Sequence, residues 1–166
     1  MRRTRRVLVA GLVATAFALT GCGAGTDAAS QKWYQPADGA FVDAGDIAIR
    51  GIVVVADDAG AGTVLANFAN PTNEAERVTS IVLNGVPAPL ASPITIPAEG
   101  YASTTPQDMR VMVAGAGAEA GRYSTVDFVF ENAEQASVQT VARPSTIEYY
   151  AEFAPVFPAV EPPVTP

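Results

Sequence analysis

Short runs of β-branched and aromatic residues, separated by turn clusters, are the feature that most limits how this chain can fold. The most regular run is 123–131, with Val126, Phe128 and Phe130 on one face and polar side chains on the other. Alternation with a period of two is typical of a half-buried strand. Similar runs recur through the chain and end at Gly, Pro, Asn or Asp. We predict strands over 46–56, 63–70, 78–83, 94–96, 109–113, 123–131 and 136–142.

About seven short strands, with no helical period outside the N-terminal segment, predict an all-β fold. We expect an antiparallel β-sandwich of the cupredoxin or immunoglobulin kind, with Phe128 and Phe130 between the sheets. The Asn84-Gly85 dipeptide predicts a tight hairpin turn after the strand over 78–83. Tyr149, Tyr150 and Phe153 follow the last predicted strand. They are expected to pack on the sandwich, and an exposed aromatic motif is the alternative.

The N-terminal segment has the form of a bacterial signal peptide. Four arginines lie within the first six residues, an apolar run covers 7–19, and the sequence Leu19-Thr20-Gly21-Cys22 follows. That sequence resembles the lipobox of bacterial lipoproteins. The resemblance implies that the Cys22 sulfur takes a diacylglycerol and that cleavage makes this cysteine the first residue. The protein would then lie at the extracytoplasmic face of the cell membrane, held by the lipid on Cys22.

Two alternatives are that the apolar run is a membrane-spanning anchor and that Cys22 follows an ordinary signal peptide by coincidence. A membrane-spanning helix needs about 20 apolar residues, and the run over 7–19 is shorter. Cys22 is the only cysteine of the chain, so a coincidental cysteine would have to fall at the one position used for lipidation. The sequence Thr4-Arg5-Arg6-Val7-Leu8 also resembles a twin-arginine export motif, which leaves the export route open.

Composition divides the chain into four parts. Residues 1–21 are the predicted signal peptide, a helix removed by cleavage, and 22–40 form a Gly-, Ala- and Ser-rich flexible tether. The β-sandwich is expected over 41–153, and 154–166 form a Pro-rich disordered tail. Trp33 and Tyr34 interrupt the tether, and we expect them to pack on the edge of the domain.

Charge limits the partners of the protein. The net charge of the chain is −7, and it falls to −11 when the four arginines of the signal peptide are removed. An acidic surface repels phosphate backbones, so we expect no nucleic-acid partner. It also disfavours docking on anionic lipids, which leaves the lipid on Cys22 as the membrane attachment. The other partner is an unidentified envelope protein or small ligand.

No motif for catalysis, metal or cofactor binding emerges from the sequence. The chain has no histidine, which removes the usual general base near neutral pH and the commonest metal ligand. Neither Gly60-Ala61-Gly62 nor Gly115-Ala116-Gly117 continues into a phosphate-binding loop. Acidic pairs such as Asp57-Asp58 lack the spacing of a calcium loop. We therefore predict no catalytic residue, no metal site and no cofactor.

The order of strands over 45–144 resembles the PCu(A)C family of extracytoplasmic copper chaperones, and in particular its actinobacterial lipoproteins. The strands over 63–70 and 78–83, a proline-rich stretch, Ile94-Thr95-Ile96-Pro97, and the segments 109–115 and 125–130 carry this likeness. The resemblance implies a cupredoxin-like sandwich and Cu(I) bound by histidine and methionine. Its His-x-Met pair falls on Arg110 and Met112 when aligned on Gly115. Arginine offers no lone pair to a metal, so the family's ligand set is missing.

The resulting hypothesis is a lipid-anchored lipoprotein of the bacterial cell envelope that acts as a non-catalytic binding module. The first alternative is an extracytoplasmic copper-handling protein with a degenerate site. Its methionines would be Met109 and Met112, which point to opposite faces if both lie on one strand. The second alternative is a small hydrolase that uses two carboxylates.

Replacing the lipidated cysteine tests the proposed anchor. Two acyl chains contribute about 0.8 kcal/mol per buried CH₂, which is enough for stable attachment. Cys22→Ser is expected to release the protein from the membrane or to leave an uncleaved precursor. Cell fractionation and mass spectrometry of the N-terminus measure this. Normal processing and attachment without lipid would contradict the prediction.

Overall fold

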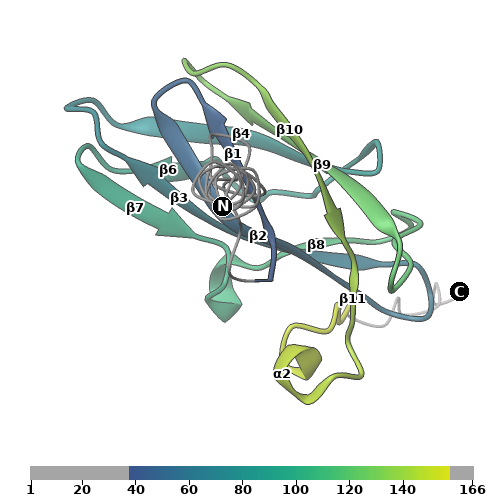
Figure 1. The fold of residues 1–166 in the computed structure, drawn as a ribbon. Coiled ribbons are helices and arrows are strands. Elements are labelled where there is room, and N and C mark those ends of the chain that lie inside the picture. The colour runs from purple at the N-terminus through teal and green to yellow at the C-terminus, as the bar shows by residue number, and fades with distance from the viewer. Residues whose placement is uncertain (1–37, 158–166) are drawn as a thin grey trace, which may run out of the picture. The chain divides into compact units, whose positions relative to one another are not determined.

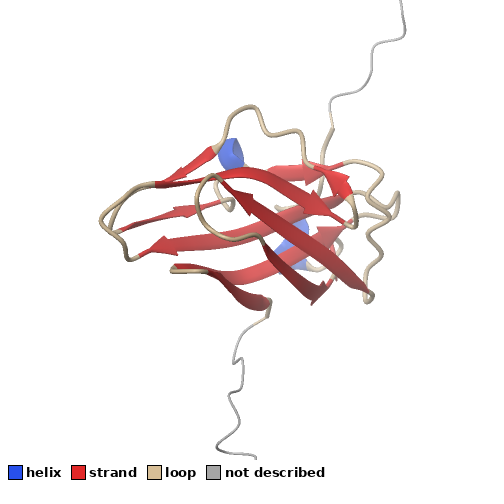
Figure 2. Cartoon of the chain, turned by 90° about the horizontal axis from the view of Figure 1, so that it is seen from above, coloured by secondary structure: helices blue, strands red, loops and turns tan. Residues whose placement is uncertain are grey.

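The computed structural model describes residues 38–157, which form two β-sheets packed face to face (Figure 1). The two layers are clear when the molecule is viewed from above (Figure 2). The predicted all-β sandwich is thus confirmed. Within the described residues, no helix is long and apolar enough to cross a membrane. Cys22, the signal peptide, Trp33, most of the tether and the end of the tail lie outside the described residues.

The first sheet has the strand order β1-β2-β3-β7. Two further strands join it, because β8 also pairs with β3 and the short β11 runs parallel to β2. The bounds are β1 Ala40–Ala44, β2 Ile47–Ala56, β3 Gly62–Asn70, β7 Gly100–Ser103, β8 Val111–Val113 and β11 Arg143–Pro144.

The second sheet has the order β10-β9-β4-β5, with β6 also paired to β4. Its strands are β4 Glu76–Leu83, β5 Val86–Pro87, β6 Ile94–Ile96, β9 Tyr123–Phe130 and β10 Ala136–Val141. Two short helical turns complete the described chain: η2 (Gln107–Met109) before β8 and α2 (Glu148–Ala151) after β11.

Aromatic contacts between the sheets form the centre of the core. The ring of Phe68 on β3 meets the rings of Phe128 and Phe130 on β9 edge to face, at centroid distances of 5.6 and 6.4 Å. All three side chains are buried, as predicted for the two phenylalanines of β9. Edge-to-face geometry adds about 0.5–1.5 kcal/mol per pair to the free energy of burial.

Two tight turns are stabilised by residues that favour turns, Asn84-Gly85 in one and Asp57 in the other. Asn84 and Gly85 both have positive φ angles, of 49° and 83°, so β4 and β5 form the predicted hairpin. The Asn84 Oδ1 atom also accepts a hydrogen bond from the Thr125 amide. In the turn between β2 and β3, Asp57 Oδ1 accepts hydrogen bonds from the amides of Ala59 and Ala61. Asp57 therefore closes a turn.

Residues 145–157, which we call the C-terminal segment, cover part of the outer face of the first sheet. Val53, Val55 and Leu65 point away from the inter-sheet core and form a second apolar cluster with Tyr150 and Phe153. This confirms that the aromatic residues after the last long strand pack on the sandwich. Tyr149 differs, since 74% of its surface is exposed.

Three parts of the strand prediction were wrong. The predicted strand over 109–113 begins only at Val111, because Met109 ends the helical turn η2. The short strand β7 was missed, because its only large side chain, Tyr101, is 82% exposed and the strand shows no apolar alternation. The strand β1 and the two-residue strand β11 were also missed, and β1 starts at Ala40, the last residue of the expected tether.

Glu76 is a buried carboxylate that fixes the turn between β9 and β10. Only 7% of the residue is exposed, and its carboxylate accepts hydrogen bonds from the amides of Arg77, Asn132 and Ala133. Burial raises the pKa of Glu76, but these amide hydrogen bonds together outweigh burial and lower the pKa below its usual 4.5.

Truncation of one core aromatic residue tests the register of β9. Phe128→Ala is expected to lower the free energy of unfolding by about 3–5 kcal/mol, because it opens a cavity between the sheets. Thr125→Ala on the other face is the matched control and should cost far less. Thermal or urea unfolding measures both, and the reverse order would show that the register is wrong by one residue.

Protonation of Glu76 should weaken the fold at acidic pH. Because the folded-state pKa is lowered, the carboxylate stabilises the protein above the unfolded pKa of about 4.5 and this stabilisation is lost as pH falls through the folded-state pKa. Glu76→Gln should cost about 1–3 kcal/mol at pH 7, and the difference from the wild type should shrink at pH 3. Urea unfolding at both pH values measures this, with the exposed Glu134→Gln as control. A pH-independent difference would contradict it.

Candidate functional site

The chain leaves the first sheet between β7 and β8. The strand β7 pairs with residues 67–70 of β3, and β8 pairs with 62–64, so the middle of β3 has no paired strand on that side. Thr104 fills the gap: its Oγ1 donates to the Val64 carbonyl and accepts from the Ala66 amide, both at 2.9 Å. Residues 105–110 are thereby held as a projection at the edge of the sheet.

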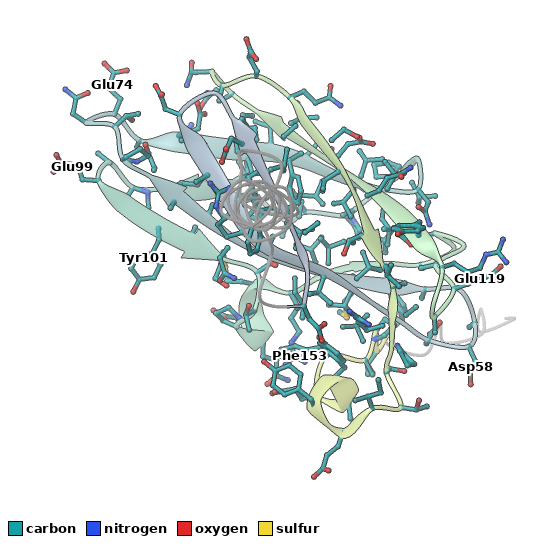
Figure 3. All side chains as sticks on the ribbon, viewed as in Figure 1. Asp58, Glu74, Glu99, Tyr101, Glu119 and Phe153 are labelled. Atoms are coloured by element: carbon teal, nitrogen blue, oxygen red, sulfur yellow. The ribbon has the colours of Figure 1, made fainter. Side chains whose placement is uncertain are left out.

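A hollow of about 580 Å³ lies between this projection and the C-terminal segment. Phe153 marks the place where that segment meets the rest of the domain (Figure 3). The floor and one wall are polar and come from β3, β7 and the projection, while the C-terminal segment forms the other wall. The lining residues are Asn67, Ser103, Thr105, Pro106, Gln107, Arg110, Glu152 and Phe153.

Arg110 is the only charged side chain that the projection adds to the hollow. Its Nη1 donates a hydrogen bond of 2.6 Å to the main-chain carbonyl of Glu152, and its guanidinium carbon lies 5.1 Å from the centre of the Phe153 ring. Its Nε atom is buried and has no hydrogen-bond acceptor. The cation–π contact and the carbonyl thus hold the guanidinium in place but leave it incompletely satisfied.

Among the arginines of residues 38–157, Arg110 alone has no carboxylate partner. The other four each lie 2.6 to 3.5 Å from an Asp or Glu oxygen: Arg50 with Asp43, Arg77 with Glu131, Arg122 with Glu119 and Arg143 with Asp38. Arg110 is therefore the one arginine of these residues whose charge is not balanced by a carboxylate within 4 Å.

Small polar side chains line the same hollow as Arg110. Ser103 Oγ donates to Asn67 Oδ1 at 2.8 Å and accepts from the Thr105 amide at 3.1 Å. Asn67 Nδ2 donates only a long hydrogen bond of 3.4 Å, to the Arg50 carbonyl. These groups offer both donors and acceptors to a bound polar molecule.

A second hollow of about 420 Å³ adjoins the first, and Asn67, Thr105 and Phe153 line both. It is lined by aliphatic and aromatic side chains together with polar ones. The other residues lining it are Asp38, Gly51, Val53, Leu65, Tyr149 and Tyr150. The two hollows together form a groove on the outer face of the first sheet, and the second hollow has the larger share of aliphatic and aromatic side chains; we call it the Arg110 groove.

Asp38 fixes the apolar end of the Arg110 groove. One carboxylate oxygen pairs with Arg143 at 2.8 Å and the other accepts a hydrogen bond from the Tyr150 hydroxyl at 3.2 Å. Burial, followed by the hydrogen bond to Asp38 and its negative charge, raises the pKa of the Tyr150 phenol. Tyr150 therefore stays a neutral donor at physiological pH.

The positions that align with the family's His-x-Met pair lie on this same outer face. Val111 and Val113 point into the core, so Met112 between them points outward, where it pairs with Thr63 of β3. Thr63 is fully buried and its Oγ1 has no hydrogen-bond partner. Met109 lies outside the strand and is 38% exposed. Within residues 38–157, no three His, Cys, Asp or Glu side chains form a group that would hold a metal ion.

The sequence analysis named four residues that line the Arg110 groove. Arg110 occupies a family ligand position, and Tyr149, Tyr150 and Phe153 were expected to pack on the sandwich, with an exposed aromatic motif as the alternative. Asn67, Ser103 and Thr105 were missed, because hydroxyl and amide side chains near strand ends are common and carry no pattern. One feature of the sequence could have indicated the site: Arg110 is a basic residue directly before the apolar run 111–114, in a chain that has few basic residues.

Comparison with known proteins supports the fold. No family model and no curated protein matches the sequence. Among solved structures, the copper-bound PCuAC domain from PmoF2 matches with a TM-score of 0.51 at 12% identity, over 63% of this chain and 98% of that one. The apo PCuAC domain from PmoF1 gives 0.53 at 16% identity, over 63% and 99%. The apo PmoF2 domain gives 0.50 at 12%, over 64% and 97%.

These similarities cover nearly the whole of each PCuAC domain, and at such low identity they establish a shared fold. The sequence itself adds the main chemical difference, since it contains no histidine. The described domain thus resembles the PCuAC domains in fold and lacks imidazole ligands for copper.

Proposed function

We propose that this protein is a non-catalytic binding protein of the bacterial cell envelope, held at the extracytoplasmic face of the membrane by a lipid on Cys22. Its binding site is the Arg110 groove. The observation that carries the proposal is the unpaired guanidinium of Arg110, held by Phe153 and the Glu152 carbonyl in a hollow lined by polar side chains. A fixed but unsatisfied cation is what a site for a polar or anionic ligand requires.

The chemistry of Arg110 argues against a copper chaperone of the usual kind. A guanidinium is permanently charged and has no lone pair, so it repels a metal cation at the position where the family offers imidazole. The second histidine of the family's ligand set has no counterpart either. The fold is therefore retained while the ligands of the metal are not.

Copper handling through a degenerate site remains the second candidate function. The similarity to a domain described as copper-bound favours it. Thioether sulfur binds Cu(I), and Met112, three residues after Met109, points outward from the sheet. A closed site of three or four ligands would still need groups from a second chain.

A hydrolase that uses two carboxylates finds less support. Such an enzyme needs one carboxyl group whose pKa is raised, so that it serves as an acid near neutral pH. Glu76 is the most buried carboxyl group of the described residues, and its pKa is lowered. Its oxygens are occupied by main-chain amides, which suits a structural role.

Competition for Cu(I) separates the first two functions. The full chain, purified in detergent, is titrated against a high-affinity Cu(I) chelator. We expect weak binding or none, and no effect of Met112→Leu. A one-to-one complex that survives the competition and is lost in Met112→Leu would overturn our proposal in favour of copper handling.

A further inference from the structure

We infer that the Arg110 groove binds a carboxylate attached to an aromatic or branched aliphatic group. This inference rests on the proposed function and adds the chemical class of the ligand. The carboxylate would come from a small organic acid or from the C-terminal residue of a polypeptide, since both present the same chemistry.

The polar half of the groove fits a single carboxylate. The Arg110 guanidinium is planar and pairs with the two oxygens of a carboxylate through parallel hydrogen bonds. The side chains of Asn67 and Gln107 line the same hollow, and their amide N–H groups offer further donors. Arg110 has no carboxylate of this protein within 4 Å among the described residues, so a ligand would not have to displace one.

The charges around the groove disfavour a polyanion. Glu152 lines the polar hollow and Asp38 lines the apolar one, although Asp38 is already paired with Arg143. Arg110 is the only cation among the residues that line the two hollows, so it can balance one negative charge of a ligand. A phosphate ester or a dicarboxylate would face repulsion from Glu152 and from the acidic surface.

The second hollow accounts for the apolar group that we expect on the ligand. The exposed ring of Tyr149 and the edges of the nearly buried Val53, Leu65, Tyr150 and Phe153 line a hollow of about 420 Å³ that adjoins the polar one. An apolar group attached to the carboxylate would reach this hollow past Phe153, which borders both. Burial of that group gives selectivity over acetate.

Paired ligands test both halves of this inference. The full chain in detergent is titrated by NMR with N-acetylphenylalanine, its neutral carboxamide, N-acetylglycine and inorganic phosphate. We expect N-acetylphenylalanine to bind at least about tenfold more tightly than its amide, which lacks the charge that Arg110 pairs with. N-acetylglycine, which lacks the ring, and phosphate should also bind more weakly.

Variants of the groove identify the residues responsible. Arg110→Gln should weaken binding of N-acetylphenylalanine by about tenfold or more, and Arg110→Lys should cause a smaller loss because it keeps the charge without the planar fork. Arg122→Gln removes the same charge on the exposed surface and is the matched control, with no expected change. Glu152→Gln should strengthen binding, because it removes the repelling carboxylate and leaves its main-chain carbonyl in place.

Peptides ending in phenylalanine distinguish the two sources of the carboxylate. Tighter binding of a tetrapeptide with a free C-terminus than of N-acetylphenylalanine supports a polypeptide C-terminus, and the reverse order supports a small acid. The inference is overturned if no carboxylate binds, if phosphate binds more tightly, if the amide binds equally well, or if Arg122→Gln matches Arg110→Gln. Such a failure leaves the copper competition unaffected, so it would not by itself overturn the proposed function.

Discussion

Burial of β2 and β3 on both faces determines how the rest of the domain is arranged. One face packs against the second sheet through Phe68, Phe128 and Phe130, and the other carries Val53, Val55 and Leu65. A sheet face with these side chains needs a cover, since each exposed branched residue would forgo about 1.5–3 kcal/mol of burial. Tyr150 and Phe153 provide that cover, and the C-terminal segment is consequently part of the fold.

The Arg110 groove follows from this cover and from one interruption of the sheet. Thr104 replaces a strand residue beside β3, so that residues 105–110 project and bring Arg110 toward Phe153. Asp38 then joins the C-terminal segment to the first described residues through Arg143 and Tyr150. Both ends of the groove are therefore held by contacts between segments that lie far apart in the sequence.

The resemblance to PCuAC domains separates fold from chemistry. Proteins at 12 to 16% identity keep the same sandwich, because its core needs only apolar side chains at alternating positions. A metal site needs particular donor atoms, and this sequence contains no imidazole. At the position that the resemblance aligns with a family histidine stands Arg110, whose guanidinium has no lone pair for a metal.

The sequence by itself determined the class of fold, the hairpin at Asn84-Gly85 and the inward face of β9, because alternation and turn residues are local properties of the chain. It also indicated that copper ligands of the family are missing, since that depends on residue types alone. Only the tertiary structure decided that Arg110 lacks a carboxylate partner and meets Phe153, which lies 43 residues later in the chain. Such contacts depend on how distant segments pack, and no local pattern of residues encodes them.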